Sequence, residues 1–310
     1  MNFLFDRRRF ASTLLGAALA FACALPAYAA DSVKVGSKLD AEASVLGSII
    51  LQVLSANGVA TENKLQLGPT KIVRTALLSG EIDIYPEYTG NAAFFHNADS
   101  DPAWKSLDAG YRKAKELDAK NKVVWLAAAP ANNTWAVAVR QDVAGPNKLV
   151  TVADFAKWVN GGGKVKLAGS AEFVESPAAL PAFQSTYGFK LAADQIVVLA
   201  GGDTSVFEKA AAEGTSGVNA AVAYGTDGAI SALGLVALDD NKGAQIVYAP
   251  APVVRADVLA KHPEIEKALA PVFASLDAAT LRKLNAEISL DGKDAKAVAA
   301  AYLKAKGFVK

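Results

Sequence analysis

The chain has 310 residues, of which 52% are hydrophobic and 20% charged, and its formal net charge is +1 at pH 7. This hydrophobic content excludes a disordered chain, and the length predicts one large or two ordinary domains. The balanced charge offers no polybasic surface to nucleic acid or anionic lipid, so we expect a small or neutral partner.

The first 30 residues have the features of a signal peptide. Three arginines, Arg7 to Arg9, precede an apolar run that is too short to span a membrane and ends in Ala27-Tyr28-Ala29. We therefore expect export to the periplasm, by a Sec or a twin-arginine route that the sequence does not distinguish. Removing this segment takes away three arginines, one aspartate and Cys23, the only cysteine, so the formal charge becomes −1. The mature fold must then be stable without disulfides.

From residue 32 onward, short apolar runs alternate with longer segments of helical periodicity, which is typical of an α/β fold. In the first half the pattern predicts strands at residues 32–38, 62–68 and 82–88 and helices at 39–58, 70–80 and 107–120. Residues 122–142 contain two strand-like runs. A second series follows, with helices at 151–160, 176–188 and 203–214 and strands at 164–170, 195–201 and 219–230. Two more apolar runs, at 232–240 and 244–255, precede the C-terminal helices.

These elements predict two α/β lobes joined by two crossing segments, one near Trp135 and one near Tyr224. The expected boundaries are residues 31–134 and 227–310 for lobe I and residues 135–226 for lobe II, after a signal peptide at 1–30. A cleft between two lobes is a common ligand site, and hinge closure is the common motion.

The sequence is poor in catalytic groups. It has two histidines, His96 and His262, with neither a cysteine partner nor the spacing of a metal site. It lacks a G-x-S-x-G nucleophile motif, and the glycines before Lys164 lack the rest of a phosphate-binding loop. We therefore expect no enzyme activity, no metal and no cofactor.

Aromatic residues stand where the lobes are expected to meet. Tyr85 and Tyr88 lie at the end of a predicted strand, Trp135 in the first crossing and Tyr224 in the second. The negative face of an aromatic ring attracts a cation, and it holds a quaternary ammonium group with about 0.5 to 2 kcal/mol per ring. Each ring taken alone could be an ordinary core residue, but together they predict a cage for a cation.

Several longer motifs resemble those of a known family. They are "VGSKLDAEASVLGSIILQVLSANG", "LGPTKIVRTALLSGEIDIYPEYTGN", "NNTWAVAV", "YGTDGAI", "LVALDDNKG" and "APAPVVRADVLAKHPEIEKAL". From about Val33 to the C-terminus the chain resembles the substrate-binding protein of glycine betaine, choline and related osmoprotectant ABC transporters, most of all the YehZ/OsmF branch. The resemblance implies a two-lobed periplasmic binding protein of the second type, whose ligand cleft lies between lobes linked by two crossing hinge segments.

The resemblance also assigns aromatic site residues. It implies that Tyr88, Trp135 and Tyr224 are walls around the trimethylammonium group. Trp135 stands where many members have tyrosine. Phe207 falls near a further family tyrosine.

The polar part of the site departs from the family pattern. By resemblance, Lys38 holds the carboxylate of the ligand and Thr70 lies in a Gly-x-Thr turn beside the cleft. Asn91 replaces a common threonine, and Ser176 stands where the family has an arginine. Losing that charged contact weakens a carboxylate clamp by about 1.5 to 3 kcal/mol. We therefore expect weaker betaine binding than in a high-affinity system, or another ligand.

Within the Tyr-Pro-Glu-Tyr-Thr-Gly turn, we expect Tyr88 to face the ligand and Tyr85 to pack beneath it. Asp83 and Glu87 are expected to brace the turn, although the carboxylate of Glu87 could also attract the cation.

The leading prediction is a periplasmic receptor for glycine betaine or a related quaternary ammonium osmoprotectant, which docks on the permease of an ABC transporter and, through it, works with the ATPase. A receptor for choline or another compact zwitterion is the nearest alternative, and a binding protein for stress signalling is a third. A monomer is expected for a receptor of this kind.

Overall fold

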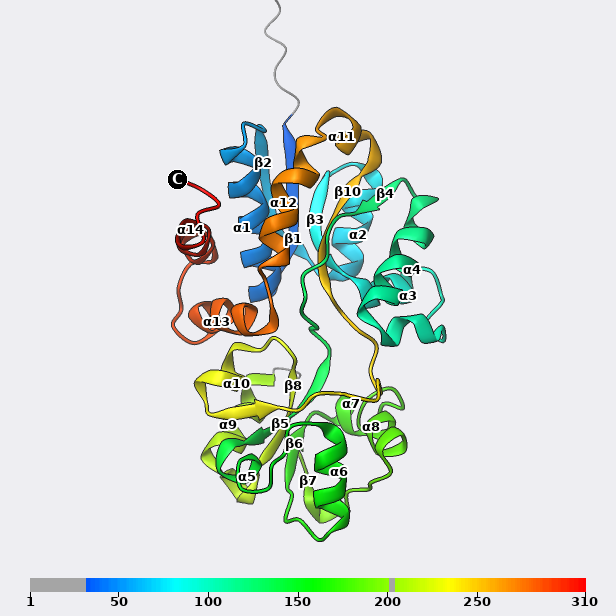
Figure 1. Cartoon of the computed structure of the whole chain (residues 1–310), viewed down its shortest axis with the longest axis vertical. Helices are drawn as coiled ribbons and strands as arrows, with labels where there is room; N and C mark the ends of the chain where they lie inside the picture. Colours follow the sequence, from blue (N-terminus) through cyan, green and yellow to red (C-terminus); the bar gives the residue numbers. More distant parts are fainter. Residues whose placement is uncertain (1–31, 201–203) are drawn as a thin grey trace, which may run out of the picture. The chain divides into compact units, whose positions relative to one another are not determined.

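Two sheets, each covered by helices, make up the architecture. The computed structural model describes residues 32–200 and 204–310, so the predicted signal peptide lies outside the described residues, as do residues 201–203 at the predicted strand-to-helix junction. Within those ranges, the strands form two five-stranded sheets in the orders β2-β1-β3-β10-β4 and β7-β6-β8-β5-β9 (Figure 1). The predicted α/β fold is confirmed.

The first sheet is built by both ends of the described chain. Its strands are β1 (Val33–Lys38), β2 (Thr61–Gly68), β3 (Ile84–Tyr88), β4 (Val123–Trp125) and β10 (Pro250–Arg255). β1 runs parallel to β2 and β3, and β10 runs antiparallel to β3 and β4. The accompanying helices are α1 (Ala41–Ala56), α2 (Thr70–Ser79), α3 (Thr89–Phe95), η1 (Pro102–Lys105), α4 (Leu107–Ala119), α11 (Ala256–Lys261), α12 (Glu264–Ala274), α13 (Ala278–Ser289) and α14 (Ala295–Ala305).

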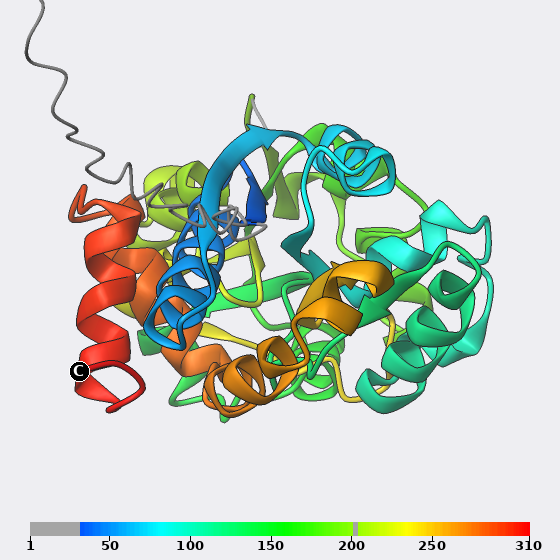
Figure 2. The same ribbon diagram turned by 90° about the horizontal axis from the view of Figure 1, so that it is seen from above.

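Helix α1 shows why this part of the chain folds as it does. Asp40 caps the helix, because its Oδ1 accepts a hydrogen bond of 2.8 Å from the backbone N–H of Ala43. The helix ends at Asn57-Gly58, where Gly58 has a left-handed φ of 81°, as the sequence predicts. Its buried Leu46 and Ile49 belong to one core with α12, α13 and α14, and α14 lies beside α1 in Figure 2. None of the described helices is both long and apolar enough to cross a bilayer.

The second sheet has the same mixture of parallel and antiparallel strands. Its strands are β5 (Trp135–Arg140), β6 (Leu167–Gly169), β7 (Ile196–Val198), β8 (Ala220–Tyr224) and β9 (Leu235–Ala237). β6 runs parallel to β7 and β8, and β5 runs antiparallel to β8 and β9. The accompanying helices are α5 (Gln141–Ala144), α6 (Val152–Asn160), α7 (Ala171–Glu175), α8 (Leu180–Tyr187), η2 (Ala193–Gln195), α9 (Thr204–Glu213), η3 (Thr215–Gly217) and α10 (Gly228–Ala232).

The chain passes between the two sheets twice. It leaves the first sheet after β4 and enters the second at β5, and it returns between β9 and β10 (Figure 1). The predicted second crossing near Tyr224 is wrong in position, because β9 follows Tyr224 and still pairs with β5. The lobe boundaries stay a prediction, and this pairing moves the proposed end of lobe II from residue 226 to the segment 238–249. Nothing in the sequence of residues 232–240 indicates which of the two sheets this apolar run joins.

Candidate functional site

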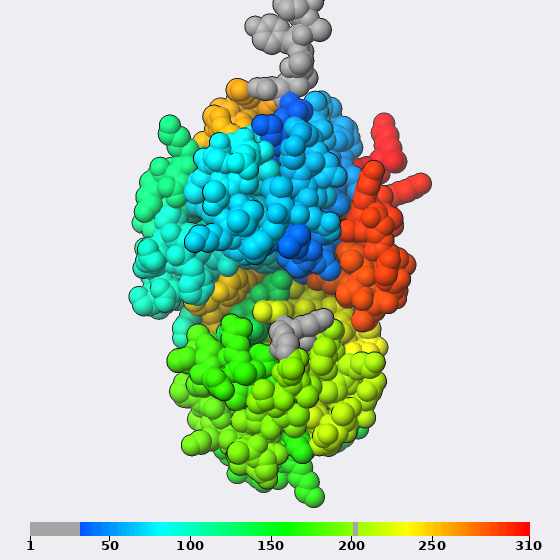
Figure 3. All heavy atoms as spheres, turned by 180° about the vertical axis from the view of Figure 1, so that it is seen from behind, coloured from blue at the N-terminus to red at the C-terminus, as the bar shows by residue number. Residues whose placement is uncertain are grey.

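A cavity of about 890 Å³ opens between the elements of the two sheets. In the space-filling view of Figure 3 it lies in the hollow between the blue and cyan part and the green and yellow part. Seven of the eight predicted site residues line it, namely Lys38, Thr70, Tyr88, Asn91, Trp135, Ser176 and Tyr224. Phe207 does not line the cavity. Its side chain is 1% exposed and belongs to the core of the second sheet, because α9 turns this face toward β6 and β8.

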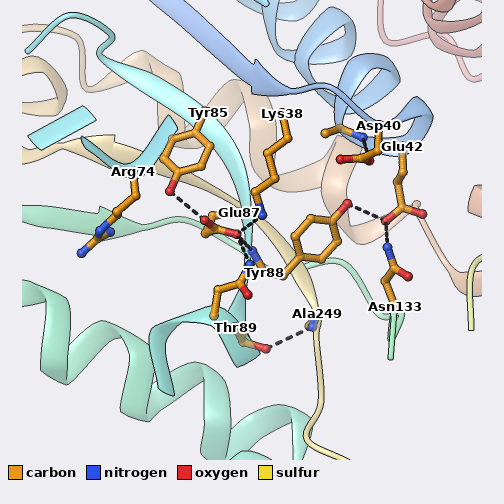
Figure 4. Close-up of polar contacts among 12 residues, drawn as sticks. Lys38, Asp40, Glu42, Arg74, Tyr85, Glu87, Tyr88, Thr89, Asn133 and Ala249 are labelled. Atoms are coloured by element: carbon orange, nitrogen blue, oxygen red, sulfur yellow. Dashed lines mark hydrogen bonds and ion pairs between the residues drawn. The ribbon is translucent and has the colours of Figure 1, made fainter. Parts of the chain in front are cut away.

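The Tyr-Pro-Glu-Tyr-Thr-Gly turn is organised around the buried carboxylate of Glu87, which is 0% exposed. Its Oε1 lies 2.5 Å from Lys38 Nζ and accepts hydrogen bonds of 2.7 Å from the backbone N–H of Tyr88 and from Asn91 Nδ2. Its Oε2 accepts a bond of 2.8 Å from the Tyr85 hydroxyl. We call these residues the Glu87 cluster (Figure 4). Tyr85 is fully buried beneath the turn and Glu87 braces it, as predicted.

Lys38 lines the cavity, but its ammonium group already has partners. Besides its ion pair with Glu87, Nζ lies 4.6 Å from the centre of the Tyr88 ring, which is a cation–π contact. A lysine has three N–H donors, and Glu87 takes one of them. Lys38 therefore fixes the Tyr88 ring as well as facing the cavity.

Tyr248, a fourth aromatic wall, was missed by the sequence analysis. It lies in the returning segment, and its backbone N–H donates to Asn132 Oδ1 over 2.8 Å, while its carbonyl accepts from the backbone N–H of Asn133 over 2.9 Å. A Cβ atom on Gly90 would lie 2.7 Å from the Tyr248 ring, so any other residue there would have to displace the ring. Burial raises the pKa of Tyr248 to about 12, so its hydroxyl stays protonated at neutral pH. The Thr-Gly and Asn-Asn motifs thus position this ring.

Trp135 and Tyr224 are directly opposite each other on the antiparallel strands β5 and β8. The ring of Trp135 packs edge to face against Phe173, with ring centres 6.0 Å apart. The backbone N–H of Tyr224 donates to Asp227 Oδ2 over 2.7 Å, which fixes the turn after β8. These two rings form one wall on the second sheet, as their positions in the sequence predict.

A second buried carboxylate, Glu42 of α1, faces the cavity. Its Oε1 accepts from the Tyr88 hydroxyl over 2.9 Å and from Asn133 Nδ2 over 3.1 Å, and its Oε2 accepts from Asn285 Nδ2 over 2.7 Å (Figure 4 shows the first two). Burial raises the pKa of Glu42, although hydrogen bonds, from Thr226 among others, oppose this. We call Glu42, Tyr88, Asn133 and Asn285 the Glu42 cluster. The sequence showed Glu42 only as an acidic residue in a first helical turn.

The charges around the cavity are mostly negative. In the part of the chain that the structure describes, Lys38 is the only lysine or arginine among the lining residues. The acidic lining residues are Asp40, Glu42, Asp99, Glu172 and Asp227. A cleft lined by one sign of charge attracts ligands of the opposite sign, so this cavity favours a cationic group.

The histidine near the site has a structural role. His96 Nε2 lies 2.8 Å from Asp118 Oδ1, and Asp118 also accepts from Arg74 and from Trp125 Nε1. Burial alone would raise the pKa of Asp118, but the hydrogen bonds and charge of Arg74 hold it below its ordinary value. Among residues 32–200 and 204–310, no group of three His, Cys, Asp or Glu side chains could hold a metal ion.

Two sheets, two crossings and a cavity between them define a two-lobed periplasmic substrate-binding protein. The profile of one family, described as the substrate binding domain of an ABC-type glycine betaine transport system, matches residues 31–305. The chain belongs to this family of binding proteins, and its homologues are substrate-binding transport proteins, not enzymes.

Individual relatives agree with this assignment. The chain is 60% identical over 290 residues to the glycine betaine-binding protein YehZ of Escherichia coli, covering 93% of this chain and 95% of that protein. It is 30% identical over 283 residues to a glycine-betaine-binding protein of Pseudomonas aeruginosa, covering 89% and 88%. Its structure is similar to that of apo YehZ from E. coli with a TM-score of 0.87, covering 90% of this chain and all of that one.

Proposed function

We propose that this chain is the periplasmic receptor of an ABC importer for glycine betaine or a related quaternary ammonium solute. The observation that carries the proposal is the cavity in which Tyr88, Trp135, Tyr224 and Tyr248 meet the buried carboxylate of Glu42. Aromatic faces and a carboxylate attract a cation that cannot donate hydrogen bonds. The relatives named for glycine betaine support the same ligand class.

The proposed binding cycle follows from where the walls originate. Tyr88 and Glu42 belong to elements of the first sheet, whereas Trp135 and Tyr224 belong to strands of the second. A ligand that contacts both sets stabilises the closed arrangement more than the open one, because only closure completes its contacts. The closed receptor, acting as a monomer, then docks on the permease, and the ATPase drives release of the ligand.

The carboxylate end of the ligand has weaker recognition than its cationic end. Ser176, in the position where the family has an arginine, lines the cavity, and Lys38 is already paired with Glu87. Betaine therefore binds with modest affinity, and choline, which has a hydroxyl instead of a carboxylate, is the second candidate ligand.

Calorimetric titration of the purified, ligand-stripped protein with glycine betaine and choline tests the proposal. Saturable binding of either ligand is expected, with a loss of about tenfold or more in Trp135→Ala because a ring of the cage is removed. Trp158→Ala is the matched control, because Trp158 packs against Phe155 of the same helix, α6, and does not line the cavity. Absence of binding by the wild type for both ligands, or equal losses in the two variants, would contradict the proposal.

A further inference from the structure

Three buried polar atoms of cavity residues have no hydrogen-bond partner in the described structure. They are the amide nitrogen Nε2 of Gln245 and the amide oxygens Oδ1 of Asn133 and Asn285. Gln245 and Asn285 are only 5% and 6% exposed to solvent. Buried polar groups in folded proteins are nearly always paired, because an unpaired one is destabilising. Three unpaired atoms around one cavity indicate groups that a ligand can engage, the amide nitrogen by a hydrogen bond and the two oxygens by electrostatic attraction to a cation.

The two asparagine oxygens belong to the cationic end of the site. Asn133 and Asn285 each use Nδ2 to donate to Glu42, and Asn285 Nδ2 also donates to the carbonyl of Thr226. These bonds fix which end of each amide is the oxygen. The free oxygens therefore add to the negative potential of the Glu42 carboxylate, which suits the methyl groups of a quaternary ammonium ion.

Gln245 is held separately from this group. Its backbone N–H and that of Ala244 donate to Asp240 Oδ2 and Oδ1, over 2.8 and 2.9 Å. Asp240 accepts in turn from the hydroxyl of Tyr187 at the end of α8, over 2.5 Å. Helix α8 begins four residues after Ser176. The Gln245 backbone is thus fixed, through Asp240, to the C-terminal end of α8, and both Gln245 and Ser176 line the cavity.

We propose that the side-chain amide of Gln245 recognises the oxygen end of the ligand, the carboxylate of betaine or the hydroxyl of choline. This inference rests on the proposed function and names the group that determines specificity. Because Nε2 has no partner, it can turn toward a ligand without breaking a hydrogen bond. A neutral amide gains less from a carboxylate than a guanidinium does, so the receptor discriminates weakly, within about tenfold, between betaine and choline.

The test compares three ligands that share a cationic end: glycine betaine, choline and tetramethylammonium, which has no oxygen. Gln245→Met removes the donor while keeping a side chain of similar length. Calorimetry should show about fivefold to tenfold weaker binding of betaine and choline, and tetramethylammonium within about twofold of wild type. Gln245→Glu adds a negative charge and should weaken betaine about tenfold more than choline. Gln141→Glu, at the exposed start of α5 and outside the cavity, is the matched control and should change neither ratio.

Three results would overturn the inference. Equal losses for tetramethylammonium and betaine in Gln245→Met would show that Gln245 only supports the fold. If both Gln245 variants keep the wild-type ratio of betaine and choline affinity to tetramethylammonium affinity, another group binds the oxygen end of the ligand. That result would leave the proposed function intact. Failure of the wild type to bind any of the three ligands would overturn the proposed function and this inference together. The methionine variant decides the matter by itself if the glutamate variant does not fold.

Discussion

Two buried glutamates in this site, Glu87 and Glu42, have opposite surroundings. Glu87 is completely enclosed and has the cation Lys38 as its partner. Glu42 is 4% exposed and lines the cavity, and within the described residues it has hydrogen-bond donors but no ion pair. The carboxylate of Glu87 is paired with a cation of the same chain and therefore belongs to the fold. The carboxylate of Glu42 lies at the edge of the cavity without such a cation, so a cationic ligand can pair with it.

The largest effect should come from breaking the enclosed pair. Glu87→Ala leaves the Lys38 ammonium buried without its counter-ion, so the free energy of unfolding should fall by about 3 to 5 kcal/mol. Urea unfolding measures this change. Glu62→Ala, which removes an exposed ion pair with Lys64, should leave the free energy of unfolding nearly unchanged, because solvent screens exposed pairs. Equal losses in the two variants would mean that the Glu87 cluster contributes nothing particular to the fold.

Glu42 should behave in the opposite way. Glu42→Gln keeps the shape of the side chain but removes its charge, so tetramethylammonium and choline should bind about 10- to 30-fold more weakly. Calorimetry measures this loss, and Glu62→Gln is the control outside the cavity. Unchanged affinity would place Glu42 with Glu87 as a structural group.

The raised pKa of Glu42 predicts how affinity depends on pH. The protonated carboxyl has no charge, so choline affinity should fall severalfold as pH decreases through a pKa above the ordinary 4.5 of a glutamate. The stability of the ligand-free protein depends on pH in the opposite direction to choline affinity. The contribution of Glu42 to the free energy of unfolding is fully present below the unfolded pKa and is lost as pH rises through the higher folded pKa. Calorimetric titrations at several pH values measure the first trend and urea unfolding without ligand measures the second, with Glu42→Gln as the pH-independent reference for both.

The smallest effect should come from Gly90 of α3, which lies against the Tyr248 ring. In Gly90→Ala the new Cβ would lie 2.7 Å from the Tyr248 ring and must displace it, so betaine should bind about threefold to fivefold more weakly. Gly110→Ala on α4 is the control, because its Cβ would come no nearer than 3.4 Å to another atom. An affinity equal to that of the control would show that the Tyr248 ring is not part of the cage.

The sequence predicted those parts of the fold and site that depend on local patterns. Alternating periodicities gave the α/β class, and Tyr88, Trp135 and Tyr224 stood at strand ends, where cavities form. Strand order depends on contacts between distant segments, so the place of β9 could not be read from its residues. The same holds for Phe207, whose inward orientation is set by the packing of α9 on the second sheet.

The missed residues had weaker signals. Tyr248 and Gln245 lie in a returning segment without periodicity, and only the fold brings them to the cavity. The glycine of the Tyr-Thr-Gly motif was a usable sign, because a glycine at the start of a helix often indicates the close approach of another group. That group is the Tyr248 ring.

The two crossing segments also carry a mechanical consequence. They are bonded to each other where Tyr248 donates to Asn132 and accepts from Asn133, so they cannot slide independently. Bending about one axis through both segments preserves these bonds, whereas twisting or shearing would break them. Bending of this kind is a closing motion that the proposed receptor can make without breaking these bonds, so we expect closure to follow it.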